Sequence, residues 1–384
     1  MNTMIQRSLA LTLKESKKSV LLLGPRQTGK STLIHALSPD LTINLAYEAT
    51  YLEFARNPSE LPERLAAGTF QTVFIDEVQR LPSLLNTIQA ILDEKRPPTK
   101  FYLTGSSARK LRRGNANLLP GRIHAYHLGP LVASELNYAL DAKQSLETGT
   151  LPGILTESDD RERRKTLQSY AATYLKEEIQ AEALTRDIEG FSRFLFVIAA
   201  EAGKFLDLSK LGASAGISRQ SAVRYFEILE DTLVLRRCDA FRKSERRRLI
   251  QSPRFFFFDT GVLNGLMNNF TASGDRIGVL FEHLLFNQLI HSAAARDLEM
   301  RVSSYRTEHG AEVDFIVEFG KELIAVEVKA SANVGKTDLR GLQSFAEYYG
   351  RKHRSVVAYL GHTRKIIEGV DILPWQLFLK DLAL

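Results

Sequence analysis

The sequence predicts an α/β protein in three parts, and three patterns support this prediction. Over roughly the first 140 residues, short apolar runs alternate with helical patterns, which favours a parallel sheet covered by helices on both faces. A helix-turn-helix pattern with a basic hairpin follows. The order helix, three strands, helix, strand then fills the end of the chain. We therefore expect domains at 1–140, 160–270 and 271–384.

The composition is that of an ordinary soluble globular protein. Apolar residues make up 44% of the chain and charged residues 25%, which leaves enough apolar side chains for several cores. No run of about 18 apolar residues is present, so we expect no transmembrane helix and no membrane partner. The single cysteine, Cys238, excludes an internal disulfide framework and is expected in a core. Without a secretory signal pattern at the start, we expect a cytoplasmic protein.

The first part of the chain has five strand-like runs with helical segments between them. In a parallel sheet with a phosphate-binding loop, we expect the fourth run to lie between the first and the third, so that polar residues at its end approach the loop. The five runs are 19–24, 41–45, 72–78, 100–106 and about 122–128.

Residues 24–31 form a complete G-x-x-x-x-G-K-[ST] phosphate-binding loop between a strand and a helix. Backbone N–H groups of such a loop bind phosphate oxygens. Lys30 is expected to reach the β- and γ-phosphates, and the Ser31 hydroxyl to bind Mg²⁺. The sequence thus predicts ATP and Mg²⁺ as ligands. The expected nucleotide contacts are Gly24, Pro25, Arg26, Gln27, Thr28, Gly29, Lys30, Ser31 and Thr32.

Two acidic residues end the third strand, and hydroxyl residues end the fourth. Asp76 is expected to hold the Mg²⁺ of ATP, and Glu77 to polarise the attacking water. Ser106 is our choice for a side chain that senses the γ-phosphate, with Thr104 and Ser107 as rivals. Helix capping is the alternative role for a serine at this place.

An arginine at the start of the fifth strand suggests a role in catalysis between subunits. Arg122 follows a stretch that carries several basic residues and no acid. If it cannot reach its own phosphate site, it could enter a neighbouring subunit's site as an arginine finger. This possibility leads us to expect a homo-oligomer, with a hexamer as one option. The alternative is a solvated or DNA-contacting basic face.

Four segments in this order resemble one family. They are Pro25–Ser31, Ile75–Arg80, Leu103–Leu111 and Leu119–Arg122. Together they resemble the AAA-type ATPases of bacteria and archaea that carry a C-terminal domain of unknown function. The resemblance covers nearly the whole chain and implies ATP hydrolysis.

The middle part predicts a winged helix. A short helix at 208–215, a turn at 216–218 and a second helix at 219–231 are followed by strand-like runs around a basic segment. Such an arrangement binds DNA, with phosphate contact more expected than base reading. A protein-interaction module or lid is the alternative. The candidate DNA contacts are Arg219, Gln220 and Arg224 on the helix and Arg246, Arg247 and Arg248 on the wing.

The last part resembles the PD-(D/E)XK nucleases in its order of elements. Asp314, Glu327 and Lys329 match the motif of that superfamily, and Glu282 would complete it from a helix. The three carboxylates would hold a second divalent metal, with Lys329 near the scissile phosphate. Val313 stands where the name-giving proline would be. Since many such folds lose cutting, a domain without nuclease activity is the alternative.

Three functions stay open at this point. The first is an ATP-driven machine that binds or remodels DNA, with branched or repair DNA as one substrate. The second is a metal-dependent nuclease gated by ATP, in defence or repair. The third is a nucleotide switch that binds proteins and performs no chemistry on DNA.

Overall fold

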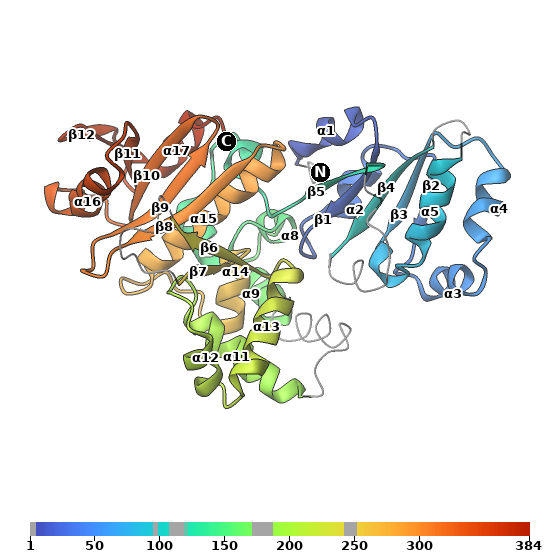
Figure 1. Ribbon diagram of the computed structural model, residues 1–384, viewed down its shortest axis with the longest axis horizontal. Coiled ribbons are helices and arrows are strands. Elements are labelled where there is room, and N and C mark those ends of the chain that lie inside the picture. The colour runs from blue at the N-terminus through green and yellow to red at the C-terminus, as the bar shows by residue number, and fades with distance from the viewer. Residues whose placement is uncertain (1–4, 95–98, 107–118, 120, 171–186, 242–251) are drawn as a thin grey trace.

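The computed structural model describes residues 5–94, 99–106, 119, 121–170, 187–241 and 252–384. Three bodies are visible in Figure 1: an N-terminal sheet with its helices in blue, a group of helices in yellow-green, and a C-terminal sheet in orange and red. The part of the chain that is described contains no helix that is both long and apolar enough to cross a membrane.

The N-terminal body is built on a parallel sheet of five strands in the order β2-β3-β4-β1-β5. The sheet is of the type found in P-loop NTPases. Strand β4 lies between β1 and β3, as the sequence predicts. The strands are β1 Ser19–Leu23, β2 Leu41–Asn44, β3 Thr72–Asp76, β4 Lys100–Gly105 and β5 Ile123–His127.

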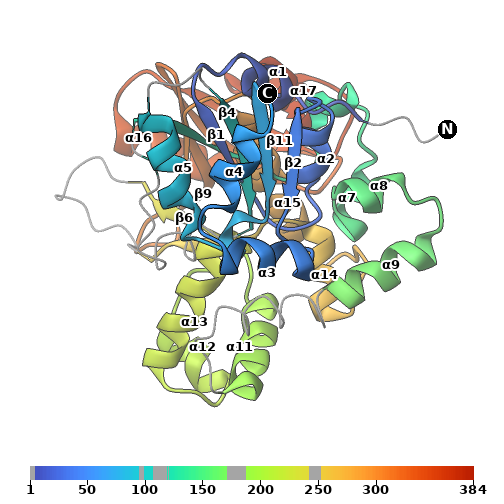
Figure 2. The ribbon, with the colours of Figure 1, turned by 90° about the vertical axis from the view of Figure 1, so that its right-hand side faces the viewer.

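Helices cover both faces of this sheet, because its central strands are apolar at successive positions. Along β1, Leu21 and Leu23 pack with one set of helices, while Val20 and Leu22 pack with the other. Residues of α3 Glu48–Arg56, α4 Glu60–Ala66 and α5 Leu84–Asp93 cover the first face, and residues of α1 Leu9–Glu15 and α2 Lys30–His35 cover the second. Figure 2 shows the sheet between these helices.

The segment after the N-terminal sheet is packed into the rest of the protein. The short helix α7 (Ala142–Thr148) packs against α14 (Thr260–Met267). The Asn264 side chain donates to the carbonyls of Leu146 and Glu147 at 2.9 and 2.8 Å. The elements are η2 Ala133–Leu136, α7 Ala142–Thr148, α8 Pro152–Thr156 and α9 Asp160–Ser169.

The middle part contains the helix-turn-helix that its sequence predicts. Helix α12 (Leu208–Ser214) and helix α13 (Arg219–Asp231) follow α11 (Ile188–Ala200). The Ser218 hydroxyl accepts a hydrogen bond from the backbone N–H of Ser221 at 3.1 Å and so caps α13. Two antiparallel strands come next, β6 Leu235–Ala240 and β7 Arg254–Phe257.

The C-terminal part has the predicted order of elements and adds three at its end. Helix α15 precedes three antiparallel strands, and the chain then returns through α16 to a strand parallel to β10. The added elements are two strands and a helix. The bounds are α15 Ile277–Ala295, β8 Met300–Arg306, β9 Glu312–Phe319, β10 Glu322–Lys329, η4 Lys336–Leu339, α16 Arg340–Tyr349, β11 Arg354–Tyr359, β12 Lys365–Ile367, β13 Val370–Pro374 and α17 Trp375–Asp381.

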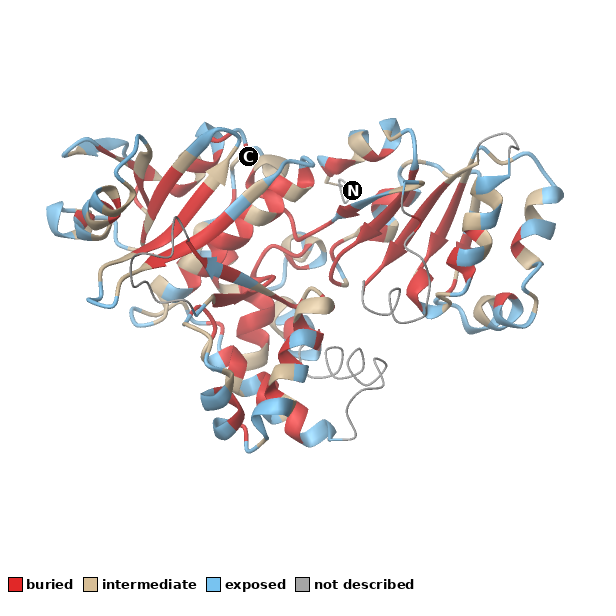
Figure 3. Cartoon of the chain, viewed as in Figure 1, coloured by how far each residue is buried: buried red, intermediate tan, exposed pale blue. Residues whose placement is uncertain are grey.

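One sheet crosses the expected boundary at residue 270. Its order is β12-β13-β11-β10-β9-β8-β6-β7, so the two strands of the middle part extend the C-terminal sheet. Asp239 and Ala240 of β6 pair in parallel with Ser303 and Ser304 of β8. One apolar core joins the two parts, as the continuous buried interior in Figure 3 indicates. The middle and C-terminal parts therefore share one sheet and one core. The division of the chain at 1–140, 160–270 and 271–384 stays a prediction.

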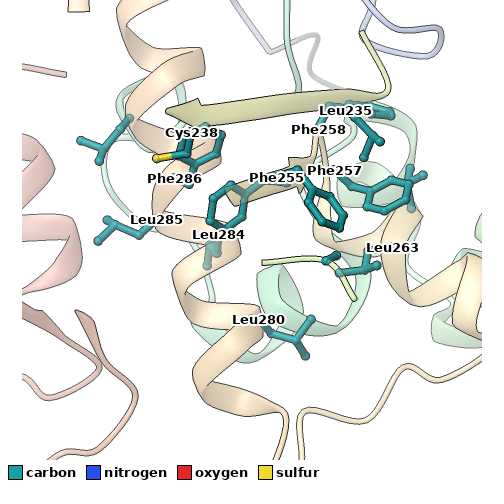
Figure 4. Packing of buried hydrophobic residues seen from close by; sticks show 14 of the residues in the cluster. Leu235, Cys238, Phe255, Phe257, Phe258, Leu263, Leu280, Leu284, Leu285 and Phe286 are labelled. Carbon is teal, nitrogen blue, oxygen red and sulfur yellow. The ribbon is translucent and has the colours of Figure 1, made fainter. Parts of the chain in front are cut away.

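Four consecutive phenylalanines, Phe255–Phe258, explain this union, because all four are fully buried. Successive side chains of a strand point to opposite faces. Phe256 stacks on Phe286 of α15 at 4.4 Å, whereas Phe255 meets Phe226 of α13 edge-on at 5.8 Å. Figure 4 shows Phe255, Phe257 and Phe258 in this core together with Phe286 and Cys238. Burial raises the pKa of the Cys238 thiol to about 12, so it is an inert core residue, as expected.

Candidate functional site

The phosphate-binding loop has the backbone that its glycines permit. Gln27 and Gly29 have φ angles of 59° and 88°. Both angles lie in the left-handed region, which glycine adopts without steric cost. A Cβ at Gly24 would clash with the carbonyl oxygen of Leu128. The loop follows Leu23 of β1 and ends as α2 begins at Lys30. Its backbone shape therefore depends on both glycines.

Lys30 lies over the centre of this loop. Its side chain is only 5% exposed, and Nζ donates to the carbonyls of Gly24 at 2.9 Å and Pro25 at 3.0 Å. The Thr28 hydroxyl donates to the same Pro25 carbonyl. Of the other predicted contacts, Gln27 and Thr32 are exposed and Arg26 is partly exposed. A buried ammonium group inside a loop of this shape is suited to bind phosphate.

The two predicted Mg²⁺ ligands are in direct contact. The Ser31 hydroxyl donates to Oδ1 of Asp76 at 2.9 Å, and the Thr104 hydroxyl donates to the same oxygen. Asp76 is only 5% exposed at the end of β3. A hydroxyl and a carboxylate are the oxygen ligands that Mg²⁺ prefers, so this donor set fits the ion.

Glu77 has an unusual backbone and two neighbours that fix its orientation. Its φ of 58° lies in the left-handed region, which is uncommon for glutamate and often found at functional sites. Its N–H donates to the Thr104 hydroxyl at 3.2 Å. Its carboxylate accepts a hydrogen bond from Nε2 of Gln79, which also donates to the Ser106 hydroxyl at 3.1 Å.

Gln79 is the residue that sequence reasoning missed. It is 4% exposed and joins the predicted base to our chosen sensor, Ser106. Its own Oε1 has no hydrogen-bond partner among the described residues. An amide two residues beyond the acidic pair was the available signal. Of the rival sensors, Thr104 bonds to Asp76 instead, and Ser107 lies outside the described residues.

Arg122 lies at the other end of the sheet from the phosphate-binding loop. It precedes Ile123, which pairs with Ser19 at the start of β1, whereas the loop follows Leu23 at its end. Five residues of strand span about 15 Å. Arg122 also forms an ion pair with Asp93. The strand register thus places Arg122 away from its own phosphate site. The role in a neighbouring subunit and the alternative of a solvated or DNA-contacting face both stay predictions.

A second arginine, Arg7, contacts the backbone of the phosphate-binding loop. It donates to the carbonyls of Thr28 at 2.6 Å and Gly129 at 2.9 Å and pairs with Glu135 at 3.0 Å. Arg7 thus joins the loop to the segment that leaves the sheet. It also lines a cavity of about 770 Å³ beside the loop, with Ile5, Leu11, Gly29, Thr32 and Pro152 among the other lining residues.

The predicted DNA contacts are only partly described. Arg219, Gln220 and Arg224 are all exposed on α13, whereas Tyr225 and Phe226 of the same helix are buried. The helix therefore presents two arginines and an amide to solvent. Arg246, Arg247 and Arg248 lie outside the described residues.

The predicted second metal site is held by cations of the protein itself. Arg254 of β7 forms an ion pair with Glu282 through Nη2 and lies 3.7 Å from Oδ1 of Asp314 through Nη1. Lys329 pairs with Glu327 at 2.9 Å. Among the residues that the structure describes, no three His, Cys, Asp or Glu side chains form a group able to hold a metal ion.

The prediction that Glu282, Asp314 and Glu327 form one ligand set is therefore corrected. The structure does bring Glu282 and Asp314 near one another, since Arg254 contacts both. Burial, together with the charges of Glu282 and Glu327, raises the pKa of Asp314 well above its ordinary value. Burial also raises the pKa of Glu327 to about 7, against the smaller opposing effect of Lys329. What the pattern did not reveal is Arg254, which comes from the preceding part of the chain.

Comparison with known proteins agrees with this architecture. Residues 16–137 match the AAA domain family, residues 140–273 match a domain of unknown function (DUF8612), and residues 277–378 match another (DUF4143). The chain thus joins an AAA-type P-loop domain to a C-terminal domain of unknown function.

Similar proteins exist among curated sequences and solved structures. An uncharacterized protein of Mycobacterium tuberculosis is 25% identical over 322 residues, which cover 82% of this chain and 70% of the relative. A RuvB variant of Thermotoga maritima is similar at 19% identity and a TM-score of 0.28, covering 59% of this chain and 85% of that one. The replication initiator DnaA, bound to AMPPCP and single-stranded DNA, is similar at 11% identity and a TM-score of 0.24, covering 58% and 85%.

Proposed function

We propose that this protein hydrolyses ATP with Mg²⁺ at the end of strands β1, β3 and β4. The observation that carries the proposal is the contact of Ser31 with Asp76 beside a loop that encloses Lys30. The match of residues 16–137 to the AAA domain family supports it.

In this proposal each described side chain has one task. Lys30 and the loop amides bind the β- and γ-phosphates, and Ser31 and Asp76 hold the ion. Mg²⁺, when bound, neutralises charge on the phosphates. Glu77 accepts the proton of the attacking water, and the Gln79 amide orients the Glu77 carboxylate. Ser106, on the other side of that amide, lies where it can report the γ-phosphate.

The cavity beside the loop is our candidate for the base and ribose. It adjoins Gly29 and Thr32, so a nucleotide whose phosphates lie in the loop can extend into it. Leu11 and Pro152 give it apolar walls suited to an aromatic ring, and the polar Arg7 is also part of its lining. Arg7 would then contact both the loop and the bound nucleotide.

We propose further that ATP turnover acts on DNA through α13. The exposed Arg219, Gln220 and Arg224 are side chains that contact phosphates and bases, and α13 belongs to a helix-turn-helix followed by two antiparallel strands, as in a winged helix. The overall charge of +6 is compatible with such a partner. Arg122, if it acts across subunits, requires a homo-oligomer.

An ATPase assay with and without DNA tests this proposal. We expect turnover that requires Lys30 and rises on addition of single-stranded, duplex or four-way DNA at low salt, where phosphate contacts are strongest. The variant Arg219→Ala/Arg224→Ala should lose the stimulation and keep basal turnover. Turnover that is indifferent to every DNA would favour the alternative, a nucleotide switch that binds proteins.

The trans role of Arg122 has its own test. We expect Arg122→Ala to lower kcat while ATP binding is retained. Mixing it with Lys30→Ala should restore activity, because one mixed interface then has an intact loop and an intact finger. No recovery in the mixture, with each variant still assembling, would contradict a finger between subunits.

A further inference from the structure

We propose that the guanidinium group of Arg254 is the resident cation of the C-terminal carboxylate centre and occupies the place that a divalent metal would take. The centre consists of Glu282 on α15, Asp314 on β9 and Glu327 on β10. The three carboxylates come from three different elements, as in many metal sites. The positive charge between Glu282 and Asp314, however, belongs to a side chain of strand β7.

The contacts of Arg254 support this assignment. Nη2 donates to Glu282, and Nη1 faces Asp314 at 3.7 Å. Within the part of the chain that the structure describes, Nη1 makes no hydrogen bond. The side chain of Arg254 is 6% exposed. A buried, unsatisfied donor that faces a carboxylate is costly, and it is tolerated here because the two charges attract.

Arg254 cannot easily leave this position to admit a metal. Its Nε donates to the Gly203 carbonyl at 2.6 Å. Its guanidinium lies 5.2 Å from the ring centre of Phe256 and 5.8 Å from that of Phe315. Cation–π contacts with two rings and the hydrogen bond from Nε therefore restrain the guanidinium group of Arg254.

Further polar contacts belong to the centre. The backbone N–H of Val328 donates to Oδ2 of Asp314 at 2.8 Å, and Lys329 pairs with Glu327 at 2.9 Å and approaches Asp338 at 3.8 Å. Two cations therefore face the three carboxylates. A divalent ion would have to displace Arg254 from Glu282 and Asp314 before it could bind both.

The position of Arg254 gives the centre a structural role. The residue belongs to the middle part of the chain, whereas Glu282 and Asp314 belong to the C-terminal part. Its Nε contact reaches Gly203, which follows α11. The ion pairs thus fasten the helical part to the C-terminal sheet, and the centre stabilises the fold without cutting nucleic acid.

Manganese binding to the nucleotide-free full-length chain tests the proposal. All proteins carry Asp76→Asn, which removes the metal ligand of the ATP site, and bound Mn²⁺ is measured by electron paramagnetic resonance. With Arg254 present, we expect no stoichiometric binding at millimolar Mn²⁺. Arg254→Met removes the charge and keeps the length of the side chain, so it should bind one Mn²⁺ per chain.

Two further variants decide the interpretation. Adding Asp314→Asn to Arg254→Met should abolish the new binding, and Arg254→Lys, which keeps a charge, should bind none. The proposal would be overturned if the protein that retains Arg254 bound one Mn²⁺ per chain and lost this binding on Asp314→Asn. This comparison can be made even if Arg254→Met fails to fold. A folded Arg254→Met that binds no Mn²⁺ would overturn the proposal as well.

Discussion

The protein contains two clusters of carboxylates, one at the phosphate-binding loop and one in the C-terminal part, and they are held in different ways. At the phosphate-binding loop, the neutral groups Ser31, Thr104 and Gln79 donate to Asp76 and Glu77. In the C-terminal sheet, the charged groups Arg254 and Lys329 neutralise Glu282, Asp314 and Glu327.

On our proposals, the first cluster is prepared for a charged ligand, whereas the second already contains its cation. A neutral donor can give up a carboxylate to an incoming ion at little electrostatic cost, whereas a buried cation cannot be removed without leaving an uncompensated charge. Acidic residues at strand ends are thus insufficient evidence for a metal site. Whether such acids bind a metal depends on their partners. One of these partners, Arg254, lies 60 residues before Asp314 in the chain.

The largest expected effect breaks the C-terminal cluster. Arg254→Ala should lower the free energy of unfolding by about 3 kcal/mol or more, because Glu282 and Asp314 lose their buried partner. Urea unfolding measures this value. The control Arg237→Ala removes a half-exposed ion pair with Glu230 and should cost less than about 1 kcal/mol. Equal losses in the two variants would contradict the view that Arg254 is the central cation.

The pH dependence of stability gives the next effect. The pKa of Glu327 is about 7 in the folded protein and 4.5 ordinarily, so between these values the folded state binds the extra proton. Stability contributed by this group is therefore lost as pH rises from about 4.5 to 7, on the order of 3 kcal/mol in total. Glu327→Gln should flatten the fall in urea stability over this range. A slope unchanged by Glu327→Gln would contradict the assigned pKa.

At the other cluster, the expected effect is on catalysis. Glu77→Gln should lower ATP turnover by at least about 100-fold, because the amide cannot accept the proton of water. Its Kd for ATP should stay within about threefold of the wild-type value. The matched control is Glu327→Gln, the same substitution in the C-terminal cluster, which should leave kcat unchanged. Similar turnover in the two variants would show that Glu77 is not the base.

The sequence predicted the N-terminal sheet well because its signals are local. Each strand there is a short apolar run whose ends fall within two residues of the predicted ones, and the loop fixes the position of β1. The C-terminal elements from α15 to β11 were also predicted from the sequence, whereas β12, β13 and α17 were not. The union of β6 and β7 with the C-terminal sheet was not predicted either, since pairing between Asp239 and Ser303 leaves no local pattern.

The same distinction applies to the candidate sites. Lys30, Ser31 and Asp76 could be named from a motif with fixed spacing, and the structure brings them together. The partners of the C-terminal carboxylates could not, because Arg254 approaches Asp314 through tertiary packing and not through sequence spacing. Gln79 lies between these cases, close to the motif in sequence but visible as a partner of Glu77 only in three dimensions.

Gln79 gives the smallest expected effect, and it tests most directly the role of the neutral donors around Asp76 and Glu77. Gln79→Ala should lower kcat for ATP about tenfold and leave KM within threefold, because the amide orients Glu77 without holding the nucleotide. Gln79→Glu keeps the shape but places a second carboxylate beside Glu77, which should move the acid limb of the kcat–pH profile upward. Gln79→Asn, which keeps the amide on a shorter stem, should recover part of the loss.

If Gln79 only supported the fold, all three variants would lower kcat together with stability and leave the pH profile in place. That outcome would remove Gln79 from the catalytic cluster.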